Sequence, residues 1–221
     1  MTASALTARV TWHAPLARDQ SPSCSPGAIQ PDLGGSARIE TARLEFALIY
    51  ARSLASMPST VLSSSSVERV RAALARAAVV AEIVELPGAA RTAKAAAEFL
   101  GCEIGQIANS LVFRAMSTDS AVLVMASGAR RVDTSRLSAV VGEPIGKADA
   151  DFVRKHTGFA IGGVAPIGHT GISKKFVEQA LSQYREIWAA AGHPHTVFRL
   201  TYPELLRITE GIAVDVAEAS R

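Results

Sequence analysis

The sequence has little cysteine, few aromatic residues and no long hydrophobic run. Its two cysteines, Cys24 and Cys102, lie far apart, which excludes a disulfide framework and gives no metal-ligand spacing. No uninterrupted apolar stretch reaches about 18 residues, the length of a membrane-spanning helix, so we predict no membrane span. Scarce cysteine is typical of a reducing compartment, and we expect a cytoplasmic protein.

The overall composition is that of a soluble domain with an extension. The chain has 221 residues, of which 48% are hydrophobic and 19% charged, enough to build one sizeable core. The net charge of +3 and the pI near 9.1 describe a mildly basic protein. Such a balance is compatible with a polyanionic partner but does not identify one.

The first part of the chain differs in composition from the rest. Residues 21–27 and 31–35 are rich in serine, proline and glycine, and hydrophobic periodicity is not sustained before about residue 60. We therefore divide the chain into an extension, residues 1–62, and a domain, residues 63–221. The extension is expected to be disordered, apart from a short helix within 44–54, or to reflect a mis-assigned start upstream of Met57.

Capping residues and hydrophobic spacing predict an alternation of helices and strands after residue 62. Ser65 with Glu68, and Thr201 with Glu204, match the capping box that starts a helix. The two β-rich runs around the turn at 117–119 indicate an antiparallel hairpin. The predicted elements are a helix from 63 with Val67, Val70, Leu74 and Ala78 on one face, a strand at 82–86, a helix from Thr92 to Gly101, strands at 107–116 and 121–126, a helix from Asp133 or Thr134 to Gly142, a helix from Asp149 to Gly158, a long helix at 176–191 packed through Val177, Leu181, Tyr184 and Trp188, a strand at 196–200, a helix from Thr201 and a strand at 212–216.

Residues 157–169 form the most informative segment, because they contain four glycines and a proline. Glycine permits positive φ and close approach of the backbone to a ligand, and proline stiffens the chain that follows. Such a segment can present peptide N–H groups to an anion or a developing oxyanion. The alternative is an ordinary turn between two elements.

Other hydrolase and metal motifs are not found in the sequence. It contains no Gly-x-Ser-x-Gly elbow, and neither cysteine has an evident histidine partner, so a serine or thiol nucleophile has little support. His193 and His195 flank a proline without a third ligand in register, which is more typical of a surface turn than of a metal site. We therefore expect no metal and no cofactor.

An ordered series of short motifs resembles the YbaK/ProX family of aminoacyl-tRNA deacylases, which includes the editing domain associated with prolyl-tRNA synthetase. The resemblance runs from about residue 65 to the C-terminus and excludes the extension. The motifs that carry it are Leu86-Pro87-Gly88, Arg91-Thr92, Gly101, Gln106-Ile107, Ser110-Leu111-Val112-Phe113, Ser127-Gly128, Arg131-Val132-Asp133, Thr157-Gly158 and Gly162-Gly163-Val164-x-Pro166-x-Gly168-His169.

The resemblance implies an α+β fold with a mixed, largely antiparallel, partly rolled sheet packed with helices. It also implies hydrolysis of the ester of mischarged tRNA. In the family the glycine-to-proline segment lies against the aminoacyl group and the terminal ribose. Carried over to this chain, that role falls on Gly162, Gly163, Val164 and Pro166.

Asn109 departs from the family pattern, which usually has lysine before the Ser-Leu-x-Phe strand. Asparagine keeps a hydrogen-bond donor and an acceptor but supplies neither a cation nor a titratable amine. Catalysis would then depend more on backbone amides, bound water and the ribose hydroxyl, with Lys147 as another source of charge. Alternatively, Asn109 is a half-buried strand residue bonded to neighbouring backbone.

The remaining site predictions each have a structural alternative. His169 could bind phosphate or ribose or polarise water, or it could bond a carbonyl of its own turn. Gly128 could simply turn the chain, and Asp133 could simply cap a helix. The residues predicted to bind substrate beside the pocket are Ser127, Gly128, Asp133, Thr157, Gly158 and Gly168.

Basic side chains are predicted to hold the acceptor end of tRNA, because cations dominate affinity for nucleic acid. Each of them could equally be a solvated surface residue. The principal predictions are Arg130, Arg131, Lys147, Lys174 and Lys175, with Arg114, Arg136, Arg154 and Lys155 as further possibilities.

The resemblance implies a trans-editing hydrolase that removes a small wrong amino acid from tRNA(Pro), and the residues are compatible with positioned water and backbone stabilisation of the oxyanion. Prolyl-tRNA synthetase is an expected partner. Two alternatives stay open: a non-catalytic tRNA- or synthetase-binding module of the same fold, and a hydrolase of a small acylated metabolite.

Overall fold

The computed structural model describes residues 60–218, and the fold is that of this part of the chain. Cys24, Met57 and the helix expected within 44–54 lie outside the described residues. The described part begins with a turn at 60–63, from which Leu62 packs against the core. The prediction of an extension over residues 1–62 stays a prediction.

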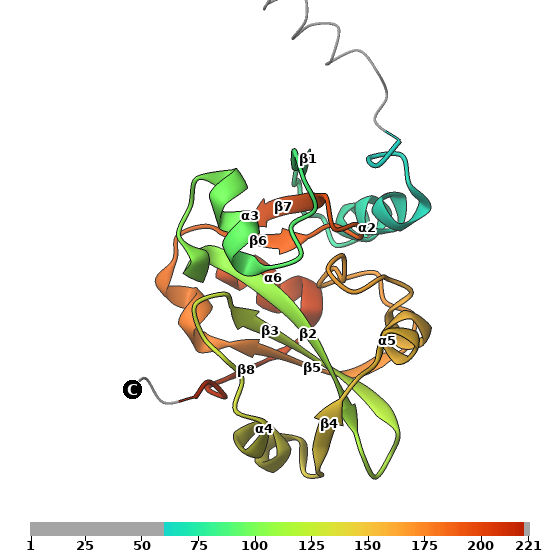
Figure 1. Ribbon diagram of the computed structural model, residues 1–221, viewed down its shortest axis with the longest axis vertical. Coiled ribbons are helices and arrows are strands. Elements are labelled where there is room, and N and C mark those ends of the chain that lie inside the picture. Colours follow the sequence, from blue (N-terminus) through green and yellow to red (C-terminus); the bar gives the residue numbers. More distant parts are fainter. Residues whose placement is uncertain (1–59, 219–221) are drawn as a thin grey trace, which may run out of the picture. The chain divides into compact units, whose positions relative to one another are not determined.

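Eight strands form one mixed sheet in the order β1-β7-β6-β2-β3-β5-β8, with β4 paired to β2 (Figure 1). The pairs β1/β7, β7/β6, β2/β3 and β2/β4 are antiparallel, whereas β6/β2, β3/β5 and β5/β8 are parallel. The strands are β1 (Ile83–Glu85), β2 (Ile107–Ala115), β3 (Ser120–Ser127), β4 (Ile145–Lys147), β5 (Ile172–Glu178), β6 (Ile187–Ala190), β7 (Thr196–Leu200) and β8 (Ile212–Val214).

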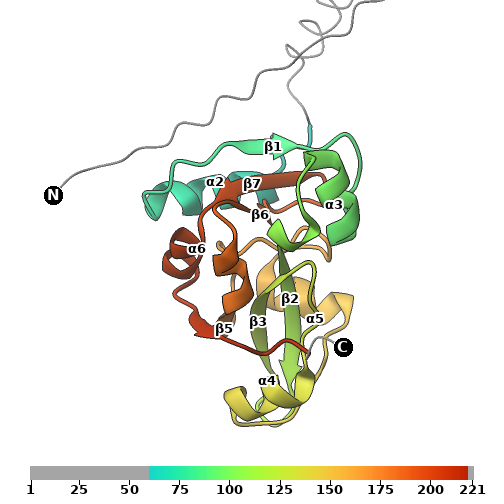
Figure 2. The ribbon, with the colours of Figure 1, turned by 90° about the vertical axis from the view of Figure 1, so that its left-hand side faces the viewer.

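The sheet bends strongly without closing. In Figure 2, β1, β7 and β6 run across one end, whereas β2 and β3 descend at a steep angle to them. The mixed, partly rolled sheet that was expected is therefore confirmed, including the hairpin of β2 and β3.

Four of the described helices, α3 to α6, begin where short-range capping predicted them. The side chains of Thr92, Asp133, Asp149 and Thr201 each accept a hydrogen bond from a backbone N–H in the first turn. The helices are α2 (Ser65–Arg76), α3 (Ala93–Leu100), α4 (Thr134–Val141), α5 (Ala150–Thr157) and α6 (Tyr202–Thr209), with 3₁₀ turns η1 (Ile104–Gln106) and η2 (Gln179–Gln183).

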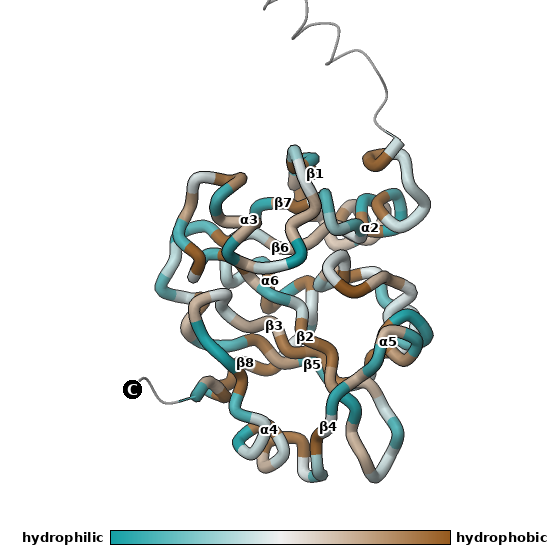
Figure 3. The backbone as a smooth tube through the Cα atoms, viewed as in Figure 1, coloured by the Kyte–Doolittle hydropathy of each residue, from teal (hydrophilic) through white to brown (hydrophobic). Residues whose placement is uncertain are grey.

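Both faces of the central strand β3 are buried, so its seven residues from 121 to 127 are all inaccessible. Leu123 and Met125 join the larger core with α2, α5 and α6, whereas Val122 and Val124 join a second core beneath α4. Figure 3 shows the hydrophobic colouring concentrated on the middle strands. Covered on both sides, β3 gives its neighbour β2 a rigid support.

The prediction of a long helix at 176–191 is wrong. The segment instead contains the end of β5, the 3₁₀ turn η2 and strand β6. Its alanine, leucine and glutamine residues favour a helix locally, but β5 is held between β3 and β8, and β6 between β2 and β7. Val177 and Leu181 are still core residues, whereas Tyr184 and Trp188 are only half-buried.

Two smaller predictions also fail. The first helix is preceded by Ser64, which makes no side-chain capping bond, so Ser65 and Glu68 do not form the expected capping box. Ala78 lies beyond the end of α2 with φ 50° and is exposed, whereas Val67, Val70 and Leu74 are buried as predicted. Strand β4 was not predicted from the sequence.

Within residues 60–218, no helix combines the length and the apolar character required to cross a lipid bilayer.

Candidate functional site

Strand β2 changes partners along one edge, and this leaves a stretch of it open. Ile107 and Ala108 pair with β6, whereas residues 113–115 pair with β4. Between them, residues 109–112 pair on the other edge with β3 alone. An open strand edge presents main-chain donors and acceptors that are available to a ligand.

The direction of these groups follows from the ladder. The carbonyl of Ile107 accepts from the N–H of Gly128 at 2.8 Å, so the odd-numbered residues of β2 exchange hydrogen bonds with β3. The peptide groups of Ser110 and Val112 therefore point toward the open edge. Ser110 also places its hydroxyl 3.4 Å from the sulfur of Met125.

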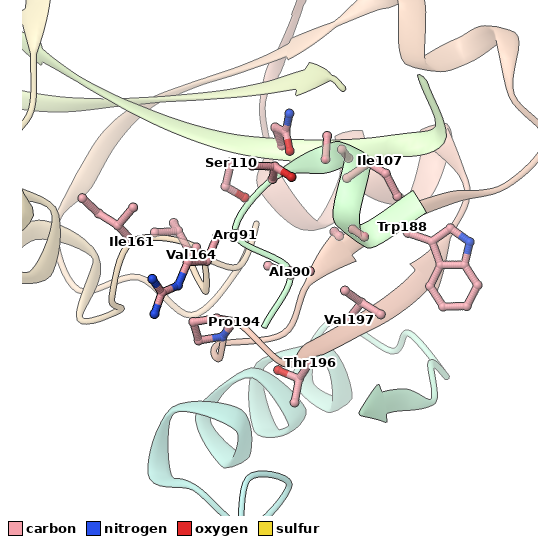
Figure 4. Close-up of a pocket in the computed structure, with 18 of the residues that line it drawn as sticks. Ala90, Arg91, Ile107, Ser110, Ile161, Val164, Trp188, Pro194, Thr196 and Val197 are labelled. Atoms are coloured by element: carbon pink, nitrogen blue, oxygen red, sulfur yellow. The ribbon is translucent and has the colours of Figure 1, made fainter. Parts of the chain in front are cut away.

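Two adjacent cavities, of about 240 and 270 Å³, lie along this open edge. Residues 157–169 are called the glycine segment here. The two cavities share a wall made by Ser110 and Leu111 of β2 and by Ile161, Gly162 and Val164 of this segment. Figure 4 shows the first cavity, with Ile161 and Val164 at one end and Trp188 at the other. The glycine segment thus lies against the unpaired stretch of β2.

The two cavities differ in their linings. The first contains polar and aromatic side chains, among them Arg91, Thr92, Asn109 and Trp188. The second, which we call the apolar cavity, is lined mainly by Val112, Phe113, Ala148 and Val153, with Lys147 on strand β4 as its cation. The first is called the polar cavity below.

The charge at both cavities is positive. Arg91 and Lys147 are their ionisable lining residues, and neither forms an ion pair with any residue in 60–218. Arg91 lies between β1 and α3, and Figure 4 shows its guanidinium near Val164 and Pro194. An anionic group at the shared wall would meet a cation on either side.

Asn109 lines the polar cavity and is half-buried. Among the described residues, its carboxamide makes no hydrogen bond to the protein, so the alternative of a purely structural asparagine has no bond to support it. The amide can donate and accept toward a bound group.

The glycine segment holds an unusual backbone at its centre. Gly162 has φ +87°, a conformation that L side chains rarely adopt, and it lies in both cavities. Gly163 donates its N–H to the carbonyl of Ala160 at 3.0 Å, and a side chain at Gly163 would collide with the backbone of His193. Within residues 60–218, the N–H groups of Gly162 and Val164 have no hydrogen-bond acceptor in the protein.

Arg69 of α2 anchors the start of this segment. It donates to the carbonyl of Gly158 at 2.6 Å, and its guanidinium lies 4.2 Å from the ring centre of Phe159, which is 1% exposed. Thr157 is also structural, because its hydroxyl bonds the carbonyl of Val153 at 2.7 Å. These contacts fix where the segment leaves α5.

His169 anchors the end of the segment. Its Nε2 lies 2.6 Å from the carbonyl of Ala165, and since a carbonyl only accepts, Nε2 carries the proton. Burial lowers the pKa of His169 to about 4; the bond to Ala165 opposes this shift, and Lys175 and Arg69 add to it. The imidazole is neutral at pH 7. It lines neither cavity, and neither does the buried Pro166.

The residues predicted to bind substrate lie elsewhere. Ser127 is buried and donates to the carbonyl of Gly105, and a side chain at Gly128 would collide with the carbonyl of Ile104. Asp133 caps α4, and Gly158 ends α5. The structure thus brings Asn109, Gly162, Val164 and Lys147 to the cavities, but not Ser127, Gly128, Asp133, Thr157, Gly158 or Gly168.

Several of the predicted cations have protein partners. Arg130 pairs with the buried Glu178 at 3.2 Å, and Lys174 pairs with Glu143 at 3.5 Å. Among the further possibilities, Arg114 pairs with Asp119 and Arg136 lies near Asp133. Arg131, Arg154 and Lys155 are exposed and have no ion pair within the described part of the chain.

Arg91, Trp188 and Pro194 also line the polar cavity, although the sequence did not predict them as site residues. Arg91 and Thr92 were part of the motif series, so their position before α3 was a usable signal. Trp188 was placed on a helix that does not exist, and no local signal brings Pro194 to the cavity. No cluster of three or more histidine, cysteine or acidic residues suited to a metal occurs within residues 60–218.

Comparisons with known proteins point to one family. Residues 87–208, more than half of the chain, match the family model described as an aminoacyl-tRNA editing domain. A solved protein proposed to be a trans-editing enzyme for prolyl-tRNA synthetase is 41% identical, has a TM-score of 0.67, and the match covers 71% of this chain and 99% of that one.

Two further relatives are similar. A scaffold used for computational grafting of linear epitopes is 39% identical, with a TM-score of 0.67 and coverage of 71% of this chain and 99% of its own. The uncharacterised protein YwhH of Bacillus subtilis is 27% identical over 124 residues, which are 56% of this chain and 78% of YwhH.

Proposed function

The chain belongs to the aminoacyl-tRNA editing domain family, and from this premise we propose that it is a trans-editing hydrolase of mischarged aminoacyl-tRNA. Its substrate is tRNA(Pro) that carries a small wrong amino acid, and its site of action is the cytoplasm. The similarity to a proposed trans-editing enzyme for prolyl-tRNA synthetase supports the choice of tRNA and a partnership with that synthetase.

The observation that carries this proposal is the wall shared by the two cavities. An aminoacyl ester has two unlike halves joined at the reacting carbonyl: a nucleoside on one side and an amino-acid side chain on the other. The polar cavity, with Asn109, Thr92 and Trp188, suits the ribose and base, and the apolar cavity suits a small side chain. The carbonyl then lies at the wall beside Gly162.

The chemistry follows from the groups at that wall. Water attacks the ester carbonyl, and the N–H groups of Gly162 and Val164 stabilise the oxyanion that forms. The N–H of Gly163 is occupied by Ala160 and takes no part. The leaving ribose oxygen accepts a proton from water, so the products are free amino acid and uncharged tRNA.

Asn109 and Lys147 have different roles at the site. Asn109 orients a ribose hydroxyl through neutral hydrogen bonds, and Lys147 supplies positive charge from the apolar cavity. His169 is a positioning residue, because it holds Ala165 rather than a ligand.

The apolar cavity supports a preference among the possible amino acids. The side chains of Val112, Ala148 and Val153 are apolar, and a bound hydroxyl group would have only Ser110 and the open peptide groups of β2 as neutral partners, so alanine is favoured over serine. A hydrophobic pocket rejects an added hydroxyl by about 100-fold at most. The expected order is therefore graded, with alanine ahead of serine and threonine.

The experiment is hydrolysis of tRNA charged with alanine, cysteine, serine, threonine or proline by the full-length protein, with spontaneous ester loss subtracted at the same pH. We expect faster loss of alanine than of serine and no acceleration of proline release. Rates equal to the uncatalysed reaction for all five charged tRNAs would refute the proposal.

The substitution at Asn109 favours one second candidate, a non-catalytic module that binds tRNA or the synthetase. This candidate predicts binding of charged tRNA without turnover, even after Asn109→Lys restores a cation at the site. Turnover by the unmodified protein would exclude it. A hydrolase of small acylated metabolites would differ from both, because tRNA would not compete with its substrate.

A further inference from the structure

A third cavity, which we call the basic groove, borders the C-terminal end of the glycine segment. It has a volume of about 410 Å³ and is lined by Ile167 and Gly168 together with residues of α2, β5 and α6. Three of its lining side chains are cations: Arg76, Lys175 and Arg207. None of the residues that line the polar and apolar cavities borders it.

The positive charge of the groove is only partly offset by the fold, where Arg207 interacts electrostatically with Glu204 of its own helix. Within residues 60–218, no ion pair involves any of the three cations, in contrast to Lys174, which binds Glu143. Glu210, exposed, is the acidic residue among the lining residues. Three like charges brought together from three elements repel one another unless an anion lies between them.

A purely structural account covers only part of this arrangement. Arg207 donates to the carbonyl of Ala77 at the C-terminal end of α2, where the helix dipole supplies about half a negative charge. That bond uses one of the five N–H donors of Arg207 and fixes its position. Within residues 60–218, Arg76 and Lys175 donate no side-chain hydrogen bond to the protein. The three cations outnumber the nearby carboxylates of Glu204 and Glu210, so the groove stays positive.

We infer that the basic groove binds the phosphodiester backbone of the tRNA acceptor arm, an inference that rests on the proposed function. Cations that converge on a groove are the usual means of holding phosphates. The seven residues from Gly162 to Gly168 span at most about 22 Å, so the groove and the cavities are within reach of one acceptor arm. Lys175, unlike its neighbour Lys174, then contacts tRNA.

The test compares two double variants of the full-length protein. Arg76→Gln/Lys175→Gln removes two charges from the groove, and Arg207 is left intact because it bonds Ala77. The matched control, Arg71→Gln/Arg199→Gln, removes two exposed charges that are paired with Glu68 and Glu186. Hydrolysis of charged tRNA and of aminoacyl-adenosine, which has no stem, is measured at several salt concentrations.

We expect the groove variant to raise KM for charged tRNA about tenfold or more. The slope of log affinity against log salt concentration should fall by the equivalent of about one to two phosphate contacts. Its kcat and its hydrolysis of aminoacyl-adenosine should equal those of the control. Equal KM values in the two variants would overturn the inference. Loss of aminoacyl-adenosine hydrolysis would also overturn it, because the cations would then act on the glycine segment itself.

A binding experiment separates this inference from the proposed function. If no charged tRNA is hydrolysed, fluorescence anisotropy with uncharged tRNA still reports the groove, and a weaker, less salt-dependent interaction in the groove variant alone supports the inference. Inorganic phosphate is the second probe. Tight binding of phosphate that does not displace tRNA would overturn the inference in favour of a site for free phosphate.

Discussion

The middle of the glycine segment and its two anchored ends are held in opposite ways. In the middle, Gly162 lies in two cavities and Ile161 is 59% exposed. At one end, Arg69 donates to the carbonyl of Gly158 and lies over the ring of Phe159. At the other end, His169 donates to the carbonyl of Ala165. The backbone that faces ligand is thus positioned by side chains that do not touch the ligand. Function and stability can therefore be separated by substitution.

The largest effect is expected at Gly162. Gly162→Ala meets only ordinary contacts near Pro194, but φ +87° strains any side chain and tilts the peptide groups at the shared wall. We expect kcat/KM for charged tRNA to fall about 10²-fold, the usual loss of one oxyanion donor. The control is Gly142→Ala, which has φ +85° in open space at the end of α4. A similar loss of activity in both variants would attribute the effect to strain alone.

Arg69→Leu is expected to act on stability first. It removes the charged bond to Gly158 and the contact with the ring of Phe159, which together are worth about 2–3 kcal/mol of unfolding free energy. Urea unfolding monitored by circular dichroism would measure the change. Arg71→Leu on the same helix loses only an exposed pair with Glu68 and should cost at most about 0.5 kcal/mol. Equal losses would mean that Arg69 does not anchor the segment.

His169 should make the free energy of unfolding depend on pH. Its folded pKa of about 4 lies below the ordinary value of 6.5, so between these values the unfolded chain binds a proton that the folded protein does not. Acidification from pH 7 to pH 5 should therefore lower the unfolding free energy by about 2 kcal/mol. Asp and Glu titrate mainly below this window.

The variant His169→Gln should unfold with a free energy that changes less between pH 7 and pH 5. His195→Gln is the control, because His195 is half-buried beside His193 and takes no part in anchoring the glycine segment. If wild type and His169→Gln show the same pH dependence, the imidazole is not held neutral by its surroundings.

The smallest effect is expected from Asn109→Lys. A cation in the polar cavity would add to the charge of Arg91 and Lys147 near the shared wall, and we expect kcat/KM to rise about tenfold, as for one hydrogen bond to a charged group. Asn109→Met, similar in length and uncharged, is the control and should lower the rate. A rise in both variants would show that charge is not the cause.

The sequence predicted the local elements better than the site. Thr92, Asp133, Asp149 and Thr201 cap the helices expected of them. The structural alternative for His169, a bond within its own turn, is the arrangement that the structure contains. By contrast, most of the predicted substrate-binding residues cap a helix or pack inside the fold, because a sequence motif does not tell which residues share a cavity.

Lys174 and Lys175 illustrate the limit of local reasoning. The two are adjacent in sequence and on strand β5, yet one pairs with Glu143 and the other lines the basic groove. Successive side chains of a strand point to opposite faces, so adjacent lysines cannot share one partner surface. The sequence shows that both residues are charged, but only the position of β5 in the sheet determines that their side chains have different surroundings.

The sequence by itself determined the starts of α3 to α6, the hairpin and the left-handed glycines that end helices, because caps, turns and φ depend on residues within about four positions of one another. Tertiary structure decided that residues 172–178 and 187–190 form strands, and that β2 has one unpaired edge between its contacts with β6 and β4. Strand pairing joins residues far apart in the chain, and its energy depends on the partner more than on local propensity. The two cavities exist only because those distant pairings leave one stretch of strand edge open.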